Sequence, residues 1–166
     1  MQKKLTTKDH IYLLLPFFIM GLLYWSSSMT AETQSLQPTL EVFMGGKPLE
    51  TFLTRFQFQY GGKVISIQNL GYFSFIEFFI RKGAHFFSYF ALGFFWVLGL
   101  KKRIREEWLT ILLSILLCIG YASFDELRQS FNPGRTGLMV DVILDTAGAI
   151  TGVGMAWFLT KKKIIR

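Results

Sequence analysis

Four long apolar stretches divide the chain, and polar segments separate them. The stretches cover approximately residues 11–25, 81–100, 108–124 and 140–159. A membrane hydrocarbon core requires roughly 20 residues of α-helix to cross it, and a helix, unlike an open sheet, satisfies its own backbone hydrogen bonds in lipid. The pattern therefore predicts an all-α membrane protein, a four-transmembrane-helix bundle in which residues 1–166 form one domain.

Basic residues border these stretches on one side of the predicted bundle. They precede the first stretch, separate the second from the third and follow the fourth, as Lys3, Lys4, Lys8, Lys101, Lys102, Arg103, Arg105, Lys161, Lys162, Lys163 and Arg166. Loops rich in Lys and Arg stay in the cytoplasm. We therefore expect a multi-pass cell-membrane protein with both termini cytoplasmic, and with residues 26–76 and 125–139 on the exported side.

Composition agrees with a membrane protein and argues against other classes. The hydrophobic fraction is 51% and the net charge is +7. Basic clusters beside apolar stretches are typical of anchors at anionic lipid, so we expect membrane lipids and no nucleic acid as partners. With the single Cys118 and two histidines, His10 and His85, the sequence contains no paired-Cys or His-x-x-x-His motif, and we predict no metal site and no cofactor.

The first stretch has two interpretations. Its basic start, apolar middle and the small residues Ser26, Ser27 and Ser28 fit a cleaved signal peptide. Tyr24 and Trp25 fit the interfacial belt of a retained transmembrane helix. We favour retention, and cleavage would leave the other three helices oriented in the same way.

The long polar segment contains a predicted β-hairpin. Gly61 and Gly62 can supply the two positive φ values of a type I′ turn. The predicted register pairs Tyr60 with Lys63, Phe58 with Ile65 and Phe56 with Ile67, which places the apolar side chains on one face. We interpret this face as a packing lid on lipid or on the tops of the helices, and a partner-binding strand is the alternative. Residues 71–80 are predicted to be helical and continuous with the second stretch.

Ionisable residues inside or beside the apolar stretches require partners or a function. Glu77, Arg81, His85 and Tyr89 recur every four residues and share one helical face. Lys82 lies beside them in the sequence.

The ends of the third and fourth stretches carry further polar residues. Asp125 and Gln129 share a helical face, as do Asp141 and Asp145, and a Pro-Gly turn directs Arg135 inward. The three helix ends should meet and form a ligand-binding pocket from Glu77, Arg81, Lys82, His85, Tyr89, Asp125, Glu126, Arg128, Gln129, Arg135, Asp141 and Asp145. The alternative is that these charges only cross-link the bundle.

Small residues in the fourth stretch predict a close helix contact. Gly148 and Gly152 form a Gly-x-x-x-Gly motif. We favour packing within one chain, and oligomerisation through the same pair is the alternative.

Taken together, these motifs resemble the VanZ family. The resemblance lies in Glu77-Phe-Phe-Ile-Arg81-Lys82-Gly-Ala-His85, in Asp125-Glu126-x-x-Gln129 with the following Pro-Gly-Arg135, and in Asp141-x-x-x-Asp145-x-x-Gly148. It implies a bacterial cell-membrane protein. The namesake of the family is associated with resistance to teicoplanin-type glycopeptides, which act on lipid-linked cell-wall precursors outside the membrane. The resemblance supplies no reaction and no catalytic residues.

Three functions fit the pattern. The leading hypothesis is a protein without demonstrated enzymatic activity, whose outward pocket binds an anionic lipid or a polyprenyl-phosphate-linked wall precursor. Arg81, Lys82, Arg128 and Arg135 would hold the anion, and His85 would titrate near neutral pH. The second is a membrane enzyme acting on a lipid-linked substrate, with His85 as base and one of Asp125, Glu126 or Asp145 as its partner. The third is a proton-coupled lipid transporter, which predicts acidic residues toward the cytoplasmic half, and stretches two to four contain none.

Overall fold

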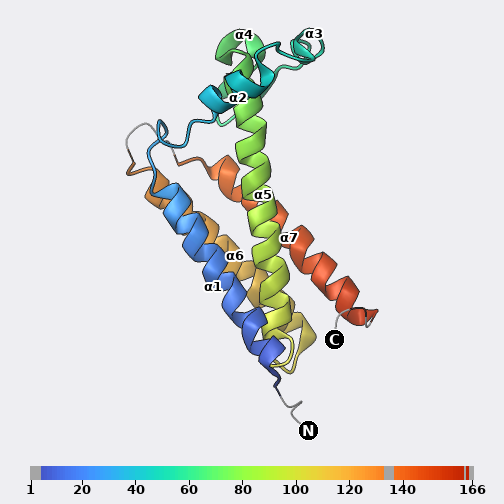
Figure 1. The fold of residues 1–166 in the computed structure, drawn as a ribbon. Helices are drawn as coiled ribbons and strands as arrows, with labels where there is room; N and C mark the ends of the chain where they lie inside the picture. The colour runs from blue at the N-terminus through green and yellow to red at the C-terminus, as the bar shows by residue number, and fades with distance from the viewer. Residues whose placement is uncertain (1–4, 133–136, 163, 165–166) are drawn as a thin grey trace.

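The computed structural model describes residues 5–132, 137–162 and 164. Its four long helices have the length and composition to cross a membrane. They are α1 (Thr7–Ser27), α5 (Tyr72–Leu100), α6 (Glu107–Gln129) and α7 (Met139–Lys161) (Figure 1). The predicted helical membrane protein is confirmed, and each helix continues beyond its apolar stretch into polar sequence.

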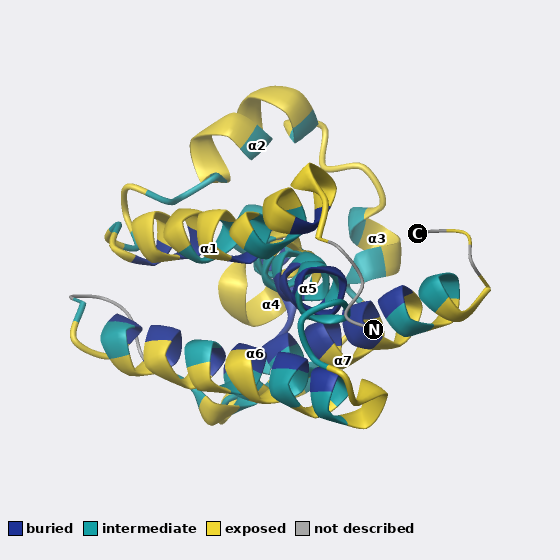
Figure 2. Ribbon diagram, turned by 90° about the horizontal axis from the view of Figure 1, so that it is seen from below, coloured by how far each residue is buried: buried dark blue, intermediate teal, exposed yellow. Residues whose placement is uncertain are grey.

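Helix α5 is the centre of the bundle. Viewed along its axis, it lies between α1, α6 and α7, which present their exposed faces outward (Figure 2). Its 29 residues correspond to about 44 Å, and its N-terminal part projects beyond the other three helices (Figure 1). We call the end of the bundle near Ser27 and Met139 the hairpin end, and the end near Thr7 and Lys161 the terminal end.

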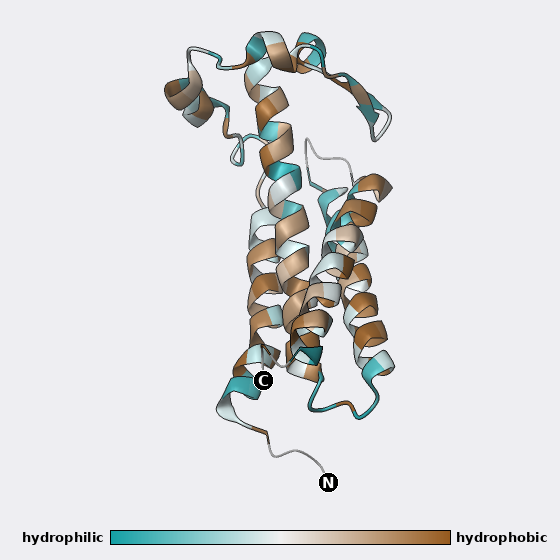
Figure 3. Cartoon of the chain, turned by 90° about the vertical axis from the view of Figure 1, so that its right-hand side faces the viewer, coloured by the Kyte–Doolittle hydropathy of each residue, from teal (hydrophilic) through white to brown (hydrophobic). Residues whose placement is uncertain are grey.

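The outward faces of the helices are apolar, as expected in lipid. Figure 3 shows hydrophobic residues along the outside of the bundle and hydrophilic residues toward its ends. Phe18, Trp108 and Leu116 are exposed on these faces. A soluble protein rarely exposes so continuous an apolar surface.

The connection from α1 to α5 folds around the projecting part of α5 (Figure 3). It contains α2 (Gln37–Met44), α3 (Glu50–Leu53), β1 (Phe58–Tyr60), β2 (Lys63–Ile65) and α4 (Ile67–Leu70). Ile65 and Ile67 are buried with Tyr72 and Phe75 of α5. The two strands were predicted from the sequence, and the three short helices were not.

The hairpin has the predicted turn and most of the predicted register. Gly61 and Gly62 have φ values of 55° and 76°, and Tyr60 pairs with Lys63 and Phe58 with Ile65. The predicted pair of Phe56 with Ile67 is wrong. The Ser66 side chain accepts a hydrogen bond from Asn69 N at 3.3 Å and caps α4, so Ile67 belongs to a helix.

The apolar face of the hairpin rests on α5. The ring centroids of Tyr60 and Phe78 are 5.2 Å apart, and those of Phe58 and Phe78 are 6.0 Å apart. These contacts agree with the interpretation of the hairpin as a packing lid on the tops of the helices.

A buried carboxylate fixes α1 at the terminal end. Asp9 is 1% exposed. Its Oδ2 accepts hydrogen bonds from Lys102 Nζ at 2.9 Å and from the Thr6 backbone N–H at 2.7 Å. This pairing joins the start of α1 to the connection between α5 and α6.

Helices α5 and α7 make the closest contact in the bundle. A Cβ atom on Gly148 would overlap the backbone oxygen of Phe86, and one on Gly152 would overlap that of Phe90. Both glycines therefore face α5 of the same chain, in agreement with the favoured interpretation that the Gly-x-x-x-Gly motif packs within one chain.

Replacing Gly152 by Ala should separate α5 from α7. We expect a loss of about 1–3 kcal/mol from overpacking, or roughly 3–10 °C in thermal midpoint in detergent. Gly154→Ala is the matched control, because nothing lies within 4 Å of a Cβ at that position, and it should leave the midpoint unchanged or raise it. A Gly152→Ala protein with an unchanged midpoint but a smaller mass by light scattering would instead place the motif between chains.

Candidate functional site

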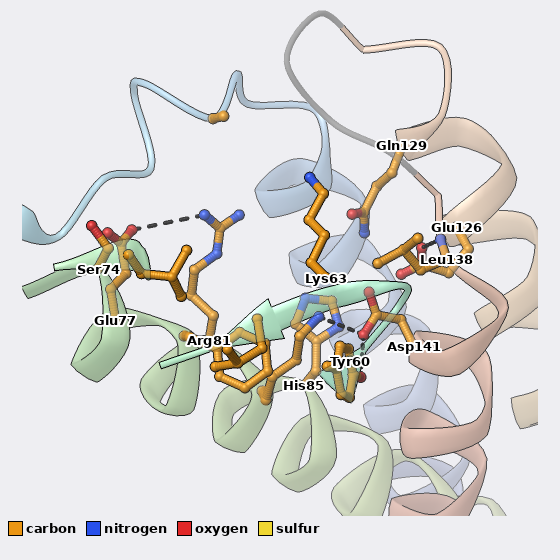
Figure 4. Close-up of a pocket in the computed structure, with 15 residues that line it drawn as sticks. Tyr60, Lys63, Ser74, Glu77, Arg81, His85, Glu126, Gln129, Leu138 and Asp141 are labelled. Carbon is orange, nitrogen blue, oxygen red and sulfur yellow. Dashed lines mark hydrogen bonds and ion pairs between the residues drawn. The ribbon is translucent and has the colours of Figure 1, made fainter. Parts of the chain in front are cut away.

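A cavity of about 340 Å³ opens at the hairpin end of the bundle. The hairpin and helices α5, α6 and α7 contribute its walls (Figure 4). Its polar lining consists of Tyr60, Lys63, Ser74, Glu77, Arg81, Lys82, His85, Glu126, Gln129 and Asp141. We call this cavity the polar pocket.

Glu77 and Arg81 form the wall of the polar pocket on α5. Arg81 Nη1 lies 3.7 Å from Glu77 Oε1, which confirms that these residues share a helical face. The Leu36 backbone N–H donates to Glu77 Oε1 at 3.1 Å, and Arg81 Nη2 donates to Gln34 Oε1 at 3.2 Å. The connection after α1 thus orients both side chains.

Asp141 joins three elements at one carboxylate. Tyr60 Oη of the hairpin donates to Asp141 Oδ1 at 2.5 Å, and Lys82 of α5 forms an ion pair with the same oxygen. Burial and the hydrogen bond to this carboxylate raise the pKa of the Tyr60 hydroxyl above its ordinary value. The Lys82 ammonium also lies 5.0 Å from the centre of the Tyr60 ring, an arrangement that favours the cation. The hairpin is therefore attached to α7 by the hydrogen bond from Tyr60 to the Asp141 carboxylate, and to α5 by aromatic contacts with Phe78.

His85 and Asp145 form a pair at the floor of the polar pocket. His85 Nδ1 lies 3.4 Å from Asp145 Oδ2. Asp145 is 0% exposed, and its Oδ1 has no hydrogen-bond partner among the residues that the structure describes. The Tyr89 hydroxyl, also fully buried, has none in the same described ranges. Polar atoms thus continue from the floor into the bundle.

Asp125 and Arg128 hold α1 against α6. Ser27 Oγ donates to Asp125 Oδ1 at 2.5 Å, and Gln129 Nε2 donates to Asp125 Oδ2 at 3.0 Å. Arg128 donates to Ser28 Oγ and to the Tyr24 carbonyl oxygen, each at 2.7 Å. Its guanidinium carbon is 4.0 Å from the centre of the Tyr24 ring. These contacts point Arg128 toward α1.

Glu126 fixes the start of α7. Its Oε2 accepts a hydrogen bond from the Leu138 backbone N–H at 2.9 Å. A Cβ on Gly137 would overlap the Glu126 carbonyl oxygen, so this backbone approaches α6 closely. Glu126 therefore has a structural partner while its side chain lines the polar pocket.

The structure brings most of the predicted residues together and assigns them to two layers. Those that line the polar pocket are Glu77, Arg81, Lys82, His85, Glu126, Gln129 and Asp141. Asp145 pairs with His85 behind them, and Asp125, Arg128 and Tyr89 are not among the lining residues. Arg135 lies outside the described residues. Several of these contacts cross-link the bundle, as the alternative interpretation proposed.

Three residues of the polar lining, Tyr60, Lys63 and Ser74, were missing from the sequence prediction. Tyr60 and Lys63 come from the hairpin and face the polar pocket (Figure 4). The predicted register placed Tyr60 and Lys63 opposite each other, and the hairpin was expected to rest on lipid or on the tops of the helices, but nothing in the sequence indicated a contact with α7 in particular. Within the described residues, no group of three or more His, Cys, Asp and Glu side chains is arranged to hold a metal ion.

Replacing Tyr60 by Phe should loosen the hairpin. The substitution removes a hydrogen bond to a charged group and leaves the ring in place, so hydrogen exchange of hairpin amides should accelerate roughly tenfold. Tyr72→Phe is the control, because the Tyr72 hydroxyl donates to the Pro48 carbonyl oxygen at 2.7 Å and does not contact the hairpin strands through it. Equal exchange in the Tyr60→Phe and wild-type hairpins would contradict the role of Asp141.

Comparison with known proteins identifies one family. The family described as VanZ/LLP1 matches residues 12–160, which include all of α5 and α6, α1 from residue 12 onward and α7 up to residue 160. No curated protein and no solved structure shows significant similarity to the chain. The family match agrees with the resemblance carried by the residues of the polar pocket, and it covers most of the sequence. The chain is therefore a membrane protein of the VanZ/LLP1 family.

Proposed function

We propose that the polar pocket binds the phosphate-bearing head group of a lipid-linked cell-wall precursor or another anionic lipid. The observation that carries the proposal is the convergence of Lys63, Arg81 and Lys82 on one open cavity within a bundle that lies in lipid. Arg81 and Lys82 belong to α5, a candidate membrane span, and ionisable groups in such helices usually mark functional sites because their burial is costly.

The basic residues differ in their availability to an anion. Lys63 forms no ion pair with any residue that the structure describes. The Arg81 side chain is 37% exposed, its Nη1 lies 3.7 Å from Glu77 Oε1, and its Nη2 donates to the neutral Gln34 amide oxygen at 3.2 Å. Lys82 is already committed to Asp141. Lys63 and Arg81 would therefore hold the phosphate, and Arg81 has the planar donor geometry that suits it.

Carboxylates in the same pocket would recognise the remainder of the head group. Glu77 and Glu126 are each hydrogen-bonded by a backbone N–H on one oxygen. Their other oxygens can accept hydrogen bonds from hydroxyl or amide groups. A phosphate attached to sugar or peptide presents both kinds of group.

The proposal places the hairpin end on the exported side of a bacterial cell membrane, with both termini cytoplasmic. It rests on the Lys and Arg clusters at the terminal end, which the positive-inside rule assigns to the cytoplasm. Teicoplanin-type glycopeptides act on lipid-linked precursors on the exported side, which is the basis for a proposed link with resistance to them.

A second candidate function is an enzyme that modifies the same lipid. The specific observation is the His85–Asp145 pair at the floor of the polar pocket, because a carboxylate on Nδ1 can orient a histidine to act as a base through Nε2. Labelled lipid recovered after binding distinguishes the two functions: a new product indicates catalysis, and intact lipid argues for binding alone.

Replacing Arg81 or Lys63 by Gln should weaken lipid binding. We expect Arg81→Gln and Lys63→Gln each to raise the Kd for a radiolabelled long-chain polyprenyl phosphate roughly tenfold, since each removes a charge-assisted hydrogen bond. Binding would be measured at equilibrium with protein in phosphatidylcholine nanodiscs.

The matched controls each remove one positive charge from the connection between α1 and α5. Arg55→Gln and Lys47→Gln change exposed residues that do not line the polar pocket, and both should bind as wild type does. If all four variants bind alike, the polar pocket is not the lipid site.

The orientation predicts which exposed positions react with a membrane-impermeant maleimide. Glu41 on α2 and Glu106 before α6 are both exposed, whereas the native Cys118 is buried. Glu41→Cys should be labelled in intact cells, and Glu106→Cys only after permeabilisation. The reverse pattern would place the polar pocket in the cytoplasm.

A further inference from the structure

A second cavity lies directly beside the polar pocket. Its volume is about 420 Å³, and it runs between α1 and α5 on the lipid-facing side of the bundle. The lining residues are Ile19, Leu22, Leu23, Ser26, Ala84, His85, Phe87, Ser88 and Ala91. We call it the apolar groove. Most of these side chains are hydrocarbon, in contrast with the charged lining of the polar pocket.

His85 lines both cavities and connects them. Lys82 and Asp141 line the polar pocket together with His85, whereas Leu22, Ala84 and Ser88 line the apolar groove with it. From His85 the groove follows α5 to Ala91. Seven residues of helix correspond to about 10 Å, directed from the hairpin end into the bilayer.

Small side chains on α5 give the groove its depth. Ala84, Ser88 and Ala91 occupy one face of the helix. Opposite them, Leu22 is 48% exposed, and Phe87 beside them is 68% exposed. The groove is thus open to lipid along its length.

We propose that the apolar groove holds the hydrocarbon chain of a single-chain lipid phosphate, of the polyprenyl phosphate class, whose head group lies in the polar pocket. This inference rests on the proposed function and specifies its ligand. A groove between one pair of helices accommodates one chain, whereas a diacyl lipid has two. The lipid would enter sideways from the bilayer and need not leave it.

The groove would determine where the hydrocarbon chain lies and would add little hydrophobic free energy to binding. A hydrocarbon chain gains little by leaving lipid for an equally apolar surface, so packing decides its affinity. A bulky side chain in the groove would force the chain outward and pull the phosphate away from Arg81. The groove therefore selects ligands whose chain continues directly from the phosphate.

The test compares two probes of different chain length in phosphatidylcholine nanodiscs. Ala84→Phe, and separately Ser88→Leu, should raise the Kd for long-chain polyprenyl phosphate about fivefold or more because the chain loses its packing site. Both should leave the Kd for dimethylallyl phosphate, whose chain is too short to fill the groove, within about twofold of wild type. Ala147→Phe is the matched control on α7, where Ala147 is exposed and lines neither cavity, and it should change neither Kd.

The outcomes separate this inference from the proposed function. If Arg81→Gln weakens both probes while Ala84→Phe and Ser88→Leu weaken neither, the polar pocket stands and the groove assignment is wrong. Equal weakening of both probes by both groove variants also overturns it. Dioleoyl phosphatidic acid that binds as tightly as polyprenyl phosphate and responds equally to Ala84→Phe would contradict a single-chain ligand. If Arg81→Gln does not change the Kd for either probe, the proposed function itself is contradicted, and the inference about the groove falls with it.

Discussion

Five carboxylates are buried at the hairpin end of a bundle that lies in lipid, and each must be compensated there. They are Glu77, Asp125, Glu126, Asp141 and Asp145, none more than 8% exposed. Removing an ion from water costs several kcal/mol even after relaxation. The donors that offset this cost come from other segments, so every buried carboxylate becomes a connection between elements.

The connections determine how the site is built. Asp141 accepts from the hairpin through Tyr60 and from α5 through Lys82. Asp125 binds α1 through Ser27, and Glu126 binds the start of α7 through Leu138. The same contacts that hold the elements together also leave Lys63 and Arg81 at the open side of the cavity. Bundle cross-linking and the proposed ligand site therefore depend on the same arrangement of charge.

Most of the features that were predicted correctly depend on residues close together in the sequence. The apolar stretches gave the four long helices, and the double glycine at Gly61 and Gly62 gave the turn and its register. The spacing of Glu77, Arg81 and His85 placed them on one face of α5. A carboxylate partner for His85 was also expected, and the structure shows Asp145 in contact with it.

Other features depend on tertiary contacts that a linear pattern does not contain. Arg128 looked equivalent to Arg81, yet its position on α6 directs it to Tyr24 and Ser28 of α1. Lys63 entered the site because the hairpin folds over α5 and α7. The short helix α4 had a local signal, the Ser66 cap, but it competed with an extension of the strand that fitted the alternation equally well.

Native mass spectrometry of protein gently extracted from its own membrane would show whether the polar pocket holds a phosphate-bearing lipid. We expect wild-type protein to retain such a lipid and the double variant Lys63→Gln, Arg81→Gln, with its fold intact, to lose it. A wild-type protein that carries no such lipid, or a double variant that retains the same lipid to the same extent, would show that the polar pocket does not bind it.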